Sequence, residues 1–194
     1  MSMLMEAAKE YAKLFDKDYI YTLETGTVLQ VYFIPGFFHH LIGLQKLKDI
    51  DVVIKRPHNS PAYIFRNILN GKISLETIQK SKFFNEIENR LRHFSQIKHM
   101  VEFEKVIVDF EPSRIRSKMG KADYVFFKRS NDNMYLNLFL TGDAKDKNKH
   151  IPLTFLAELT DYYTYGQKVI KIVSMNTIER ETKRNRAENE TTTK

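Results

Sequence analysis

The strongest constraint on the fold is a change in hydrophobic periodicity after about residue 100. Between residues 82 and 100, apolar side chains recur every three or four positions, which predicts an amphipathic helix. Four segments rich in β-branched and aromatic residues follow, separated by polar loops: VIVDF, ADYVFFKR, MYLNLFLTG and QKVIKIVSM. Antiparallel pairing is the simplest arrangement of consecutive strands. The C-terminal half therefore predicts a roughly four-stranded antiparallel sheet.

The N-terminal half reads as a helix and a hairpin followed by several helices. Residues 3–15 have helical spacing, and the strand-like runs YIYTL and VLQVYFI flank the short connection ETGT. PAYIFRNILNGK predicts a short helix that ends at an Asn-Gly pair. Residues 151–155 are expected to be extended and to continue as a short helix toward residue 163. This order predicts an α+β fold without repeated βαβ units.

The length of 194 residues predicts one domain. We assign this domain to residues 1–178. Residues 179–194 carry mixed charge and a polar end, which predicts a frayed helix or a disordered tail.

Composition restricts the classes of function. The chain has no cysteine, which excludes disulfides, thiolate metal sites and cysteine nucleophiles. No stretch approaches the roughly 20 apolar residues of a membrane helix, and the charged N-terminus does not resemble a signal peptide. A cytoplasmic protein that does not contact membranes is expected. The excess of 31 Lys and Arg over 24 Asp and Glu gives a net charge of +7, which favours an anionic partner such as nucleic acid.

Two adjacent histidines interrupt an apolar stretch, FFHHLIGLQKL, at residues 37–47. On a helix with about 100° per residue, the apolar side chains cover more than half of the circumference. His39, Gly43 and Lys46 then share the one face without an apolar side chain, whereas His40 falls between two leucines. The pattern predicts that His39 faces solvent or substrate and that His40 faces the core.

The face that carries His39 suits phosphate chemistry. An imidazole transfers protons near neutral pH, and Lys46 can stabilise the charge of a phosphorane. The same face also fits the exposed edge of a packed helix, and His40 fits a buried, hydrogen-bonded imidazole; the sequence leaves both alternatives open. Neither histidine has a second ligand four residues later, so no metal site and no cofactor are expected.

A second candidate region is the densest basic run of the chain. Together with the strand that follows, it provides cations for an RNA backbone and aromatic rings for stacking. The cations expected to bind nucleic acid are Arg114, Arg116, Lys118, Lys121 and Arg129, and Lys128 is assigned to the catalytic group with both histidines and Lys46. Tyr124, Asn137, Thr141 and Gln167 are expected to border a cleft, although a partly solvated sheet surface explains them equally well.

Motifs along most of the chain resemble a known nuclease superfamily. FFHHLIGLQKL is followed in order by ADYVFFK, NLFL, HIPLTF and YTYGQKVIKI. These motifs resemble the phage-associated barnase, EndoU, colicin and RelE-like nucleases, above all their fourth phage-type family. The similarity covers about residues 10–175.

The resemblance implies metal-independent cleavage of RNA by attack of the ribose 2′-hydroxyl on the adjacent phosphate. His39 or His40 then transfers the proton, and Lys46, Arg116, Lys118 or Lys128 supports the charged transition state. It also implies a phage or mobile-element setting, a role as a toxin or conflict effector, a structured RNA such as tRNA as target, and an inhibitor or immunity protein as partner. Two alternatives stay open: a non-catalytic nucleic-acid-binding module of the same fold, and a partner-binding subunit whose histidines belong to the core.

Overall fold

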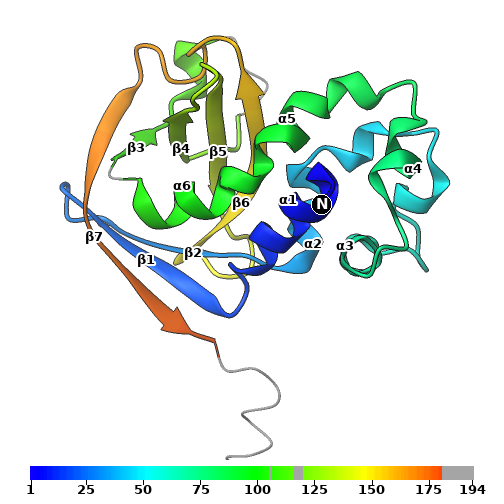
Figure 1. Ribbon diagram of the computed structural model, residues 1–194. Helices are drawn as coiled ribbons and strands as arrows, with labels where there is room; N and C mark the ends of the chain where they lie inside the picture. The colour runs from blue at the N-terminus through cyan, green and yellow to red at the C-terminus, as the bar shows by residue number, and fades with distance from the viewer. Residues whose placement is uncertain (105, 116–119, 181–194) are drawn as a thin grey trace, which may run out of the picture.

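The computed structural model describes residues 1–104, 106–115 and 120–180. Figure 1 shows α1–α4 on one side of the molecule and the strands on the other. The helices are α1 (Met3–Ala12), α2 (Pro35–Leu41), α3 (Pro61–Leu69), α4 (Leu75–Gln79), α5 (Glu88–His93) and α6 (Ile97–Phe103). The strands are β1 (Lys17–Leu23), β2 (Val28–Tyr32), β3 (Val106–Asp109), β4 (Tyr124–Arg129), β5 (Tyr135–Gly142), β6 (Lys149–Glu158) and β7 (Lys168–Glu179).

The seven strands close into one barrel in the order β1-β2-β6-β5-β4-β3-β7. Neighbouring strands are antiparallel except β2 and β6, which run parallel where Gln30 and Val31 lie opposite Lys149 and His150. The prediction of a roughly four-stranded antiparallel sheet is therefore wrong. The fold combines α-helices with a mixed, closed barrel.

Two parts of the chain account for this error. The hairpin formed by β1 and β2 was expected to be a separate element, but β1 pairs with β7 along its whole length. Residues 149–158 form the ten-residue strand β6, where a short helix was expected to follow residue 155. Both faces of β6 are partly buried: Phe155 packs into the main core inside the barrel, and Leu153 and Leu156 pack against a smaller core outside it. The strand therefore lacks the strict alternation of apolar and polar residues that marks a half-buried strand.

The predicted helix at residues 82–100 is divided into short pieces. Two 3₁₀ turns, Phe84–Glu86 and Phe94–Gln96, alternate with α5 and α6. Apolar residues in this segment often recur every third position, as at Leu91, Phe94 and Ile97, and a 3₁₀ turn places such residues directly above one another. The apolar face was predicted correctly, whereas the continuous α-helix was not.

The main core lies between the helices and the inner face of the barrel. α6 lies against this inner face (Figure 1), where the hydroxyl of Tyr21 donates to the backbone carbonyl of Val101 at 2.7 Å. On the helical side, Tyr11 packs edge-on against Phe33 and Phe65, and its hydroxyl donates to the carbonyl of Ile34 at 3.0 Å. These contacts hold the start of α2 against the barrel.

A smaller core covers the outer face of β3–β6. It is built on Val108, Val125 and Phe139, against which Tyr163 packs. The pairing register of β5 with β6 shifts between Phe139 and Leu140, whose partners are Thr154 and Pro152. Leu153 is therefore an extra residue, and this bulge interrupts β6 at the edge of the outer core.

The predicted domain boundary at residue 178 lies at the end of β7. The guanidinium of Arg180 donates to the carboxylate of Asp18 and, at 3.1 Å, to the carbonyl of Phe33. The tail predicted from residue 179 lies mostly outside the described residues, so the division into one domain and a tail stays a prediction.

Candidate active site

One pocket brings a histidine and three cations together at the junction of the helices and the barrel. Its volume is about 550 Å³. Parts of the chain far apart in sequence line it: the end of α2, the turn after it, α5, the loop before β4, and β6 with the segment that follows. The lining residues are His40, Gln45, Lys46, Arg90, Lys121, Leu153, Thr154, Leu156 and Tyr163.

The two histidines take opposite positions from those predicted. His39 is 5% exposed, and its Nε2 lies 2.7 Å from the backbone carbonyl of Val53. Because a carbonyl only accepts, this nitrogen carries the proton and donates. His40 is exposed and faces the pocket. The prediction that His39 faces solvent and His40 the core is therefore corrected.

The reason for the reversal is the length of α2. The predicted positions of the two histidines assumed one helix through residue 47. In the structure α2 ends at Leu41, and Gly43 adopts φ +84°. That left-handed conformation turns the chain into the short 3₁₀ helix Leu44–Lys46. Lys46 consequently lies beside His40 in the pocket rather than on the face of His39.

The surroundings of His40 favour its neutral form. Partial burial of the imidazole lowers its pKa, and the positive charges of Arg90 and His39 lower the pKa further. A neutral imidazole at physiological pH can accept a proton. Lys46 lies at the rim, where its Nζ is 3.4 Å from a carboxylate oxygen of Glu86.

Arg90 is unusual among the cations of this pocket because it is buried without an ion pair to any described residue. It is only 8% exposed, yet within the described ranges no carboxylate lies within ion-pairing distance of its guanidinium. Burial lowers its pKa, and the charges of Glu158 and Tyr163 act in the opposite direction. A buried arginine without such a partner carries positive charge and free donors toward the pocket.

Arg90 is not among the site residues predicted from the sequence. The residue lies next to an apolar stripe, and its neighbour Arg92 has the same side chain but pairs with Glu88 at the surface. No spacing signal distinguishes the two arginines. The distinction appears only when α5 packs against Gly43, where the chain approaches the Arg90 side chain closely.

β6 and the segment after it complete the pocket. The bulge at Leu153 interrupts the ladder beside Thr154, and both residues line the pocket. Tyr163 packs edge-on against Phe139 at 5.2 Å, and burial, followed by the charges of Glu158 and Tyr162, raises its pKa. Its phenol therefore stays protonated at neutral pH and can donate a hydrogen bond.

Among the described residues of the basic run before β4, Lys121 lines this pocket. Arg116 and Lys118 lie outside the described residues. Arg114 lines a different pocket with Tyr162 and Tyr165, and its guanidinium pairs with Glu111. The structure therefore groups Lys121, but not Arg114, with His40.

Lys128 and Arg129 lie away from the pocket. The Nζ of Lys128 is 3.0 Å from Nδ1 of His99 and 3.8 Å from a carboxylate oxygen of Glu104. Arg129 lies over the ring of Tyr135, with 5.6 Å between its Cζ and the ring centroid.

The four residues expected to border one cleft are dispersed. Tyr124 packs against His150, and Thr141 pairs with Ile151 in the barrel. Asn137 is 1% exposed and donates to the carbonyl of Tyr135 at 3.1 Å. Gln167 ties the chain to the backbone of Glu111, accepting from its N–H at 2.9 Å and donating to its carbonyl at 3.1 Å.

The described residues contain no group of three or more histidine, aspartate or glutamate side chains placed to hold a metal ion. Their helices include none long and apolar enough to cross a membrane.

Comparison with known proteins shows to which family the chain belongs. Comparison with curated proteins and with solved structures finds no match. One family model, described as phage-Barnase-EndoU-ColicinE5/D-RelE like nuclease 4, matches residues 3–190. This range includes both histidines, Arg90 and every strand of the barrel. The chain therefore belongs to this family of phage-type nucleases.

Proposed function

We propose that the protein is an endoribonuclease that cleaves RNA without a metal ion in the pocket of His40 and Arg90. The proposal depends on one observation: the buried Arg90 shares a pocket with His40, whose pKa is lowered. Within the described ranges, no carboxylate lies within ion-pairing distance of this arginine. A base and a positive charge that is not held in an ion pair are what an attack on a phosphodiester needs. Family membership supports nuclease activity.

His40 acts as the general base in this mechanism. Its neutral imidazole takes the proton of the ribose 2′-hydroxyl, and the resulting oxygen attacks the adjacent phosphorus. The bond from phosphorus to the 5′-oxygen then breaks. The products are a 2′,3′-cyclic phosphate and a 5′-hydroxyl end. DNA lacks the attacking hydroxyl, so this chemistry selects RNA.

Arg90 stabilises the extra negative charge on the phosphorus oxygens. Its guanidinium offers several donors, and the partly enclosed pocket strengthens their effect. Lys46 and Lys121 lie in the same pocket and attract the flanking phosphates.

Tyr163 is the candidate for the second proton transfer. Its raised pKa keeps the phenol protonated, and the residue lines the same pocket as His40. It can donate to a phosphate oxygen or protonate the departing 5′-oxygen.

The proposal also includes a structured RNA such as tRNA as target, a toxin role and an inhibitor protein as partner. These parts are supported by family membership alone.

The test is incubation of the full chain with total RNA in EDTA, followed by chemical mapping of the new ends. We expect 2′,3′-cyclic phosphate and 5′-hydroxyl ends from the wild type and no cleavage by His40→Ala. Lys128→Ala is the matched control, because Lys128 lies beside His99 and not in the pocket. Cleavage that persists in His40→Ala, or that requires an added divalent ion, contradicts the mechanism.

A non-catalytic RNA-binding module is the second candidate. One observation favours it: within the described residues, no group hydrogen-bonds the imidazole of His40 and sets its tautomer. Such a module retains salt-dependent RNA binding through Lys46, Arg90 and Lys121 but leaves total RNA intact in the same incubation.

A further inference from the structure

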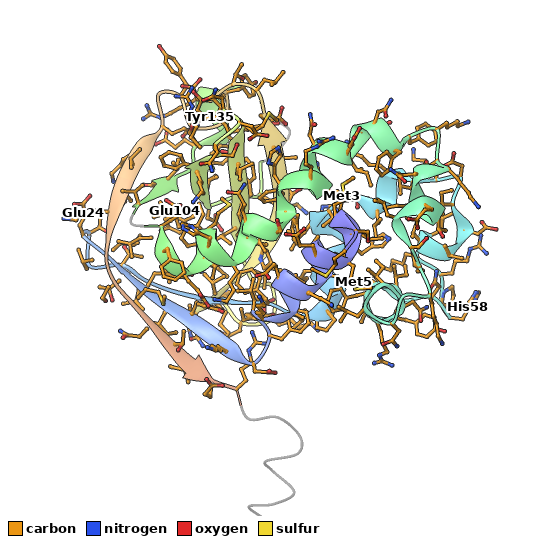
Figure 2. All side chains as sticks on the ribbon, viewed as in Figure 1. Met3, Met5, Glu24, His58, Glu104 and Tyr135 are labelled. Carbon is orange, nitrogen blue, oxygen red and sulfur yellow. The ribbon has the colours of Figure 1, made fainter. Side chains whose placement is uncertain are left out.

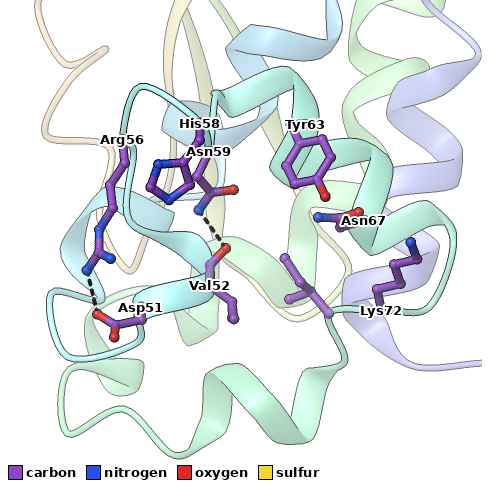
Figure 3. A pocket seen from close by; sticks show the side chains of 9 residues that line it. Asp51, Val52, Arg56, His58, Asn59, Tyr63, Asn67 and Lys72 are labelled. Carbon is purple, nitrogen blue, oxygen red and sulfur yellow. Dashed lines mark hydrogen bonds and ion pairs between the residues drawn. The ribbon is translucent and has the colours of Figure 1, made fainter.

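A second pocket lies on the helical side of the molecule, between the loop at residues 51–59 and the helix α3 (Figure 3). Its volume is about 420 Å³. Figure 2 shows that His58, one of its lining residues, lies at the edge of the molecule opposite the barrel. The lining residues are Asp51, Val52, Arg56, His58, Asn59, Tyr63, Asn67, Lys72 and Ile73.

The loop side of this pocket is held by its own contacts. The side-chain amide of Asn59 donates to the carbonyls of Val52 at 3.1 Å and Ile54 at 2.9 Å. Arg56 pairs with Asp51 at 2.8 Å. These interactions, two of which are drawn in Figure 3, fix the loop as one wall of the pocket.

The pocket also presents side chains that are not engaged elsewhere. Tyr63 and Asn67 lie one turn apart on α3 and therefore on the same face of the helix. Within the part of the chain that the structure describes, the side chains of Tyr63, Asn67, Lys72 and His58 make no hydrogen bond or ion pair. Tyr63 is 46% exposed. An aromatic ring, an amide, an imidazole and an ammonium group thus meet around one hollow (Figure 3).

The wall formed by α3 is held by a helix cap and by core packing. Ser60 caps the helix by accepting from the N–H of Tyr63 at 3.3 Å, while Ile64, Phe65 and Ile68 are buried on its inner side. Ile73, only 3% exposed, forms part of the lining. A ligand entering this pocket would meet a backbone that is already in place on both sides.

A third hollow adjoins the His40 pocket. That hollow shares Gln45 with the His40 pocket and includes Ile54 and Lys55. Arg56, the chain neighbour of Lys55, lines the pocket beside Tyr63 together with Val52. Lys48 and Lys55 line the third hollow and add positive charge there. A chain of phosphates that passes along this hollow between the two pockets would therefore meet basic side chains.

We propose that the pocket beside Tyr63 binds an unpaired nucleobase of the RNA strand that is cut at His40. The base stacks on the exposed ring of Tyr63, the amide of Asn67 reads a polar edge of the base, and Lys72 contacts the adjoining phosphate. The hollow accepts one nucleotide but no duplex, so the occupied segment is single-stranded. This inference rests on the proposed function in that it takes RNA as the substrate.

The experiment compares two substrates in EDTA: a dinucleoside monophosphate, which reaches only the His40 pocket, and a single-stranded RNA decamer. Affinity for the decamer is measured by fluorescence anisotropy with His40→Ala as the background, so that the RNA stays intact. We expect Tyr63→Ala to raise the Kd for the decamer about tenfold, the loss of one stacked base. Tyr63→Phe keeps the ring and should stay within about twofold of the background.

Two further measurements separate recognition from general damage. With an active His40, Tyr63→Ala should raise KM for the decamer and leave kcat, and all cleavage of the dinucleoside monophosphate, unchanged. A 2-aminopurine base at the occupied position should be quenched on binding, and the quenching should disappear in Tyr63→Ala but persist in Tyr63→Phe.

Lys72→Ala tests the phosphate contact. It should lower the slope of log Kd against log salt concentration by about 0.7. Lys80→Ala is its matched control, because Lys80 is an exposed lysine next to α4 that does not line the pocket, and it should change the slope less.

The outcomes distinguish this inference from the proposed function. Decamer binding that is unaffected by Tyr63→Ala, or an equal loss for both substrates, overturns the base pocket even if RNA is cleaved. Tyr63-dependent binding without any cleavage by the wild type upholds the base pocket and overturns the nuclease mechanism. No binding of either RNA by the wild type overturns both.

Discussion

Gly43 lies so close to Arg90 that a β-carbon at residue 43 would stand 3.2 Å from an Nη atom of the guanidinium and 2.8 Å from Cγ2 of Ile87. Gly43 also has φ +84°, a conformation that side chains disfavour. The turn that separates His40 from Lys46 thus also determines where the buried arginine lies.

Gly43→Ala should therefore impair both stability and cleavage. We expect the backbone strain to cost about 1 kcal/mol and the overpacking a further 1 to 3 kcal/mol, roughly. Displacement of Arg90 should lower the cleavage rate as well. Gly26→Ala is the control, because Gly26 has φ +83° but nothing within 4 Å of the added carbon. Urea unfolding and cleavage assays of both variants measure the difference; equal losses would show that the contact with Arg90 is unimportant.

Arg90→Met should lower activity without lowering stability. Removal of a preorganised positive charge from a phosphate site is expected to reduce kcat by roughly 10²- to 10³-fold. The burial of an unpaired guanidinium costs free energy, so an apolar side chain of similar length should leave the free energy of unfolding unchanged or raise it. Chemical denaturation and RNA cleavage of the same preparation test this. Loss of stability would assign Arg90 a structural role instead.

The pH dependence of cleavage should reflect His40. Its pKa is lowered by burial and then by the charge of Arg90, so kcat/KM should rise with pH through a value below 6.5 and level off near neutrality. In Arg90→Met the remaining activity should show this rise at a higher pH, because a cation that disfavours protonation is gone. A rate that instead falls as pH rises through this range would make His40 the acid.

His39 should affect stability more than chemistry. His39→Ala removes the donor to the carbonyl of Val53 and leaves that buried acceptor unpaired, at a cost of about 2 kcal/mol. His39→Gln can place an N–H near the position of Nε2 and should recover part of that loss. Thermal unfolding measures both variants. Full stability with abolished cleavage in His39→Ala would return the catalytic role to this histidine.

Asp18 should make the closed barrel sensitive to acid. Burial alone would raise the pKa of Asp18, but the hydrogen bonds from Arg180 and Gln30 and the charges of Arg180 and Lys149 outweigh it and lower the pKa. The stabilisation is therefore present above the unfolded pKa of about 3.9 and is lost as pH falls through the lower folded value.

Asp18→Asn should lower the free energy of unfolding by on the order of 3 kcal/mol at neutral pH, because it removes the ion pair with Arg180. The difference from the wild type should shrink as the pH falls below about 4, because the wild type then loses the same ion pair. Glu88→Gln, which breaks the exposed pair with Arg92, should cost no more than about 0.5 kcal/mol. Urea unfolding at several pH values distinguishes the two. A constant difference between Asp18→Asn and wild type at every pH would exclude the titration of Asp18.

Local features of the fold were predictable because they depend on short-range chemistry. The hairpin at Gly26 and the helix ended by Gly71 follow from turn preferences, and both glycines have positive φ. The barrel was not predictable in the same way. Its closure depends on the pairing of β1 with β7 and of β2 with β6, which join residues more than 100 positions apart.

In the candidate site, too, local features were predictable from the sequence and long-range contacts were not. The histidine segment was identified from composition, but assigning the two histidines required knowing where α2 ends, and Gly43 ends it before Lys46. Lys121 was expected to bind nucleic acid and does line the pocket, but its binding of nucleic acid and the catalytic roles of the other residues stay predictions. Arg90 was not predictable, since the position of α5 against Gly43 is a tertiary contact.

The place of β7 in the barrel has a consequence for the synthesis of the chain. β7 pairs with both β1 and β3, and it is the last of the described strands to leave the ribosome. Until residues 168–179 have emerged, β1 and β3 each present an unpaired edge, and the two walls of the barrel are not joined. A nascent chain therefore cannot close its barrel before residues 168–179 have been synthesised and released from the ribosome.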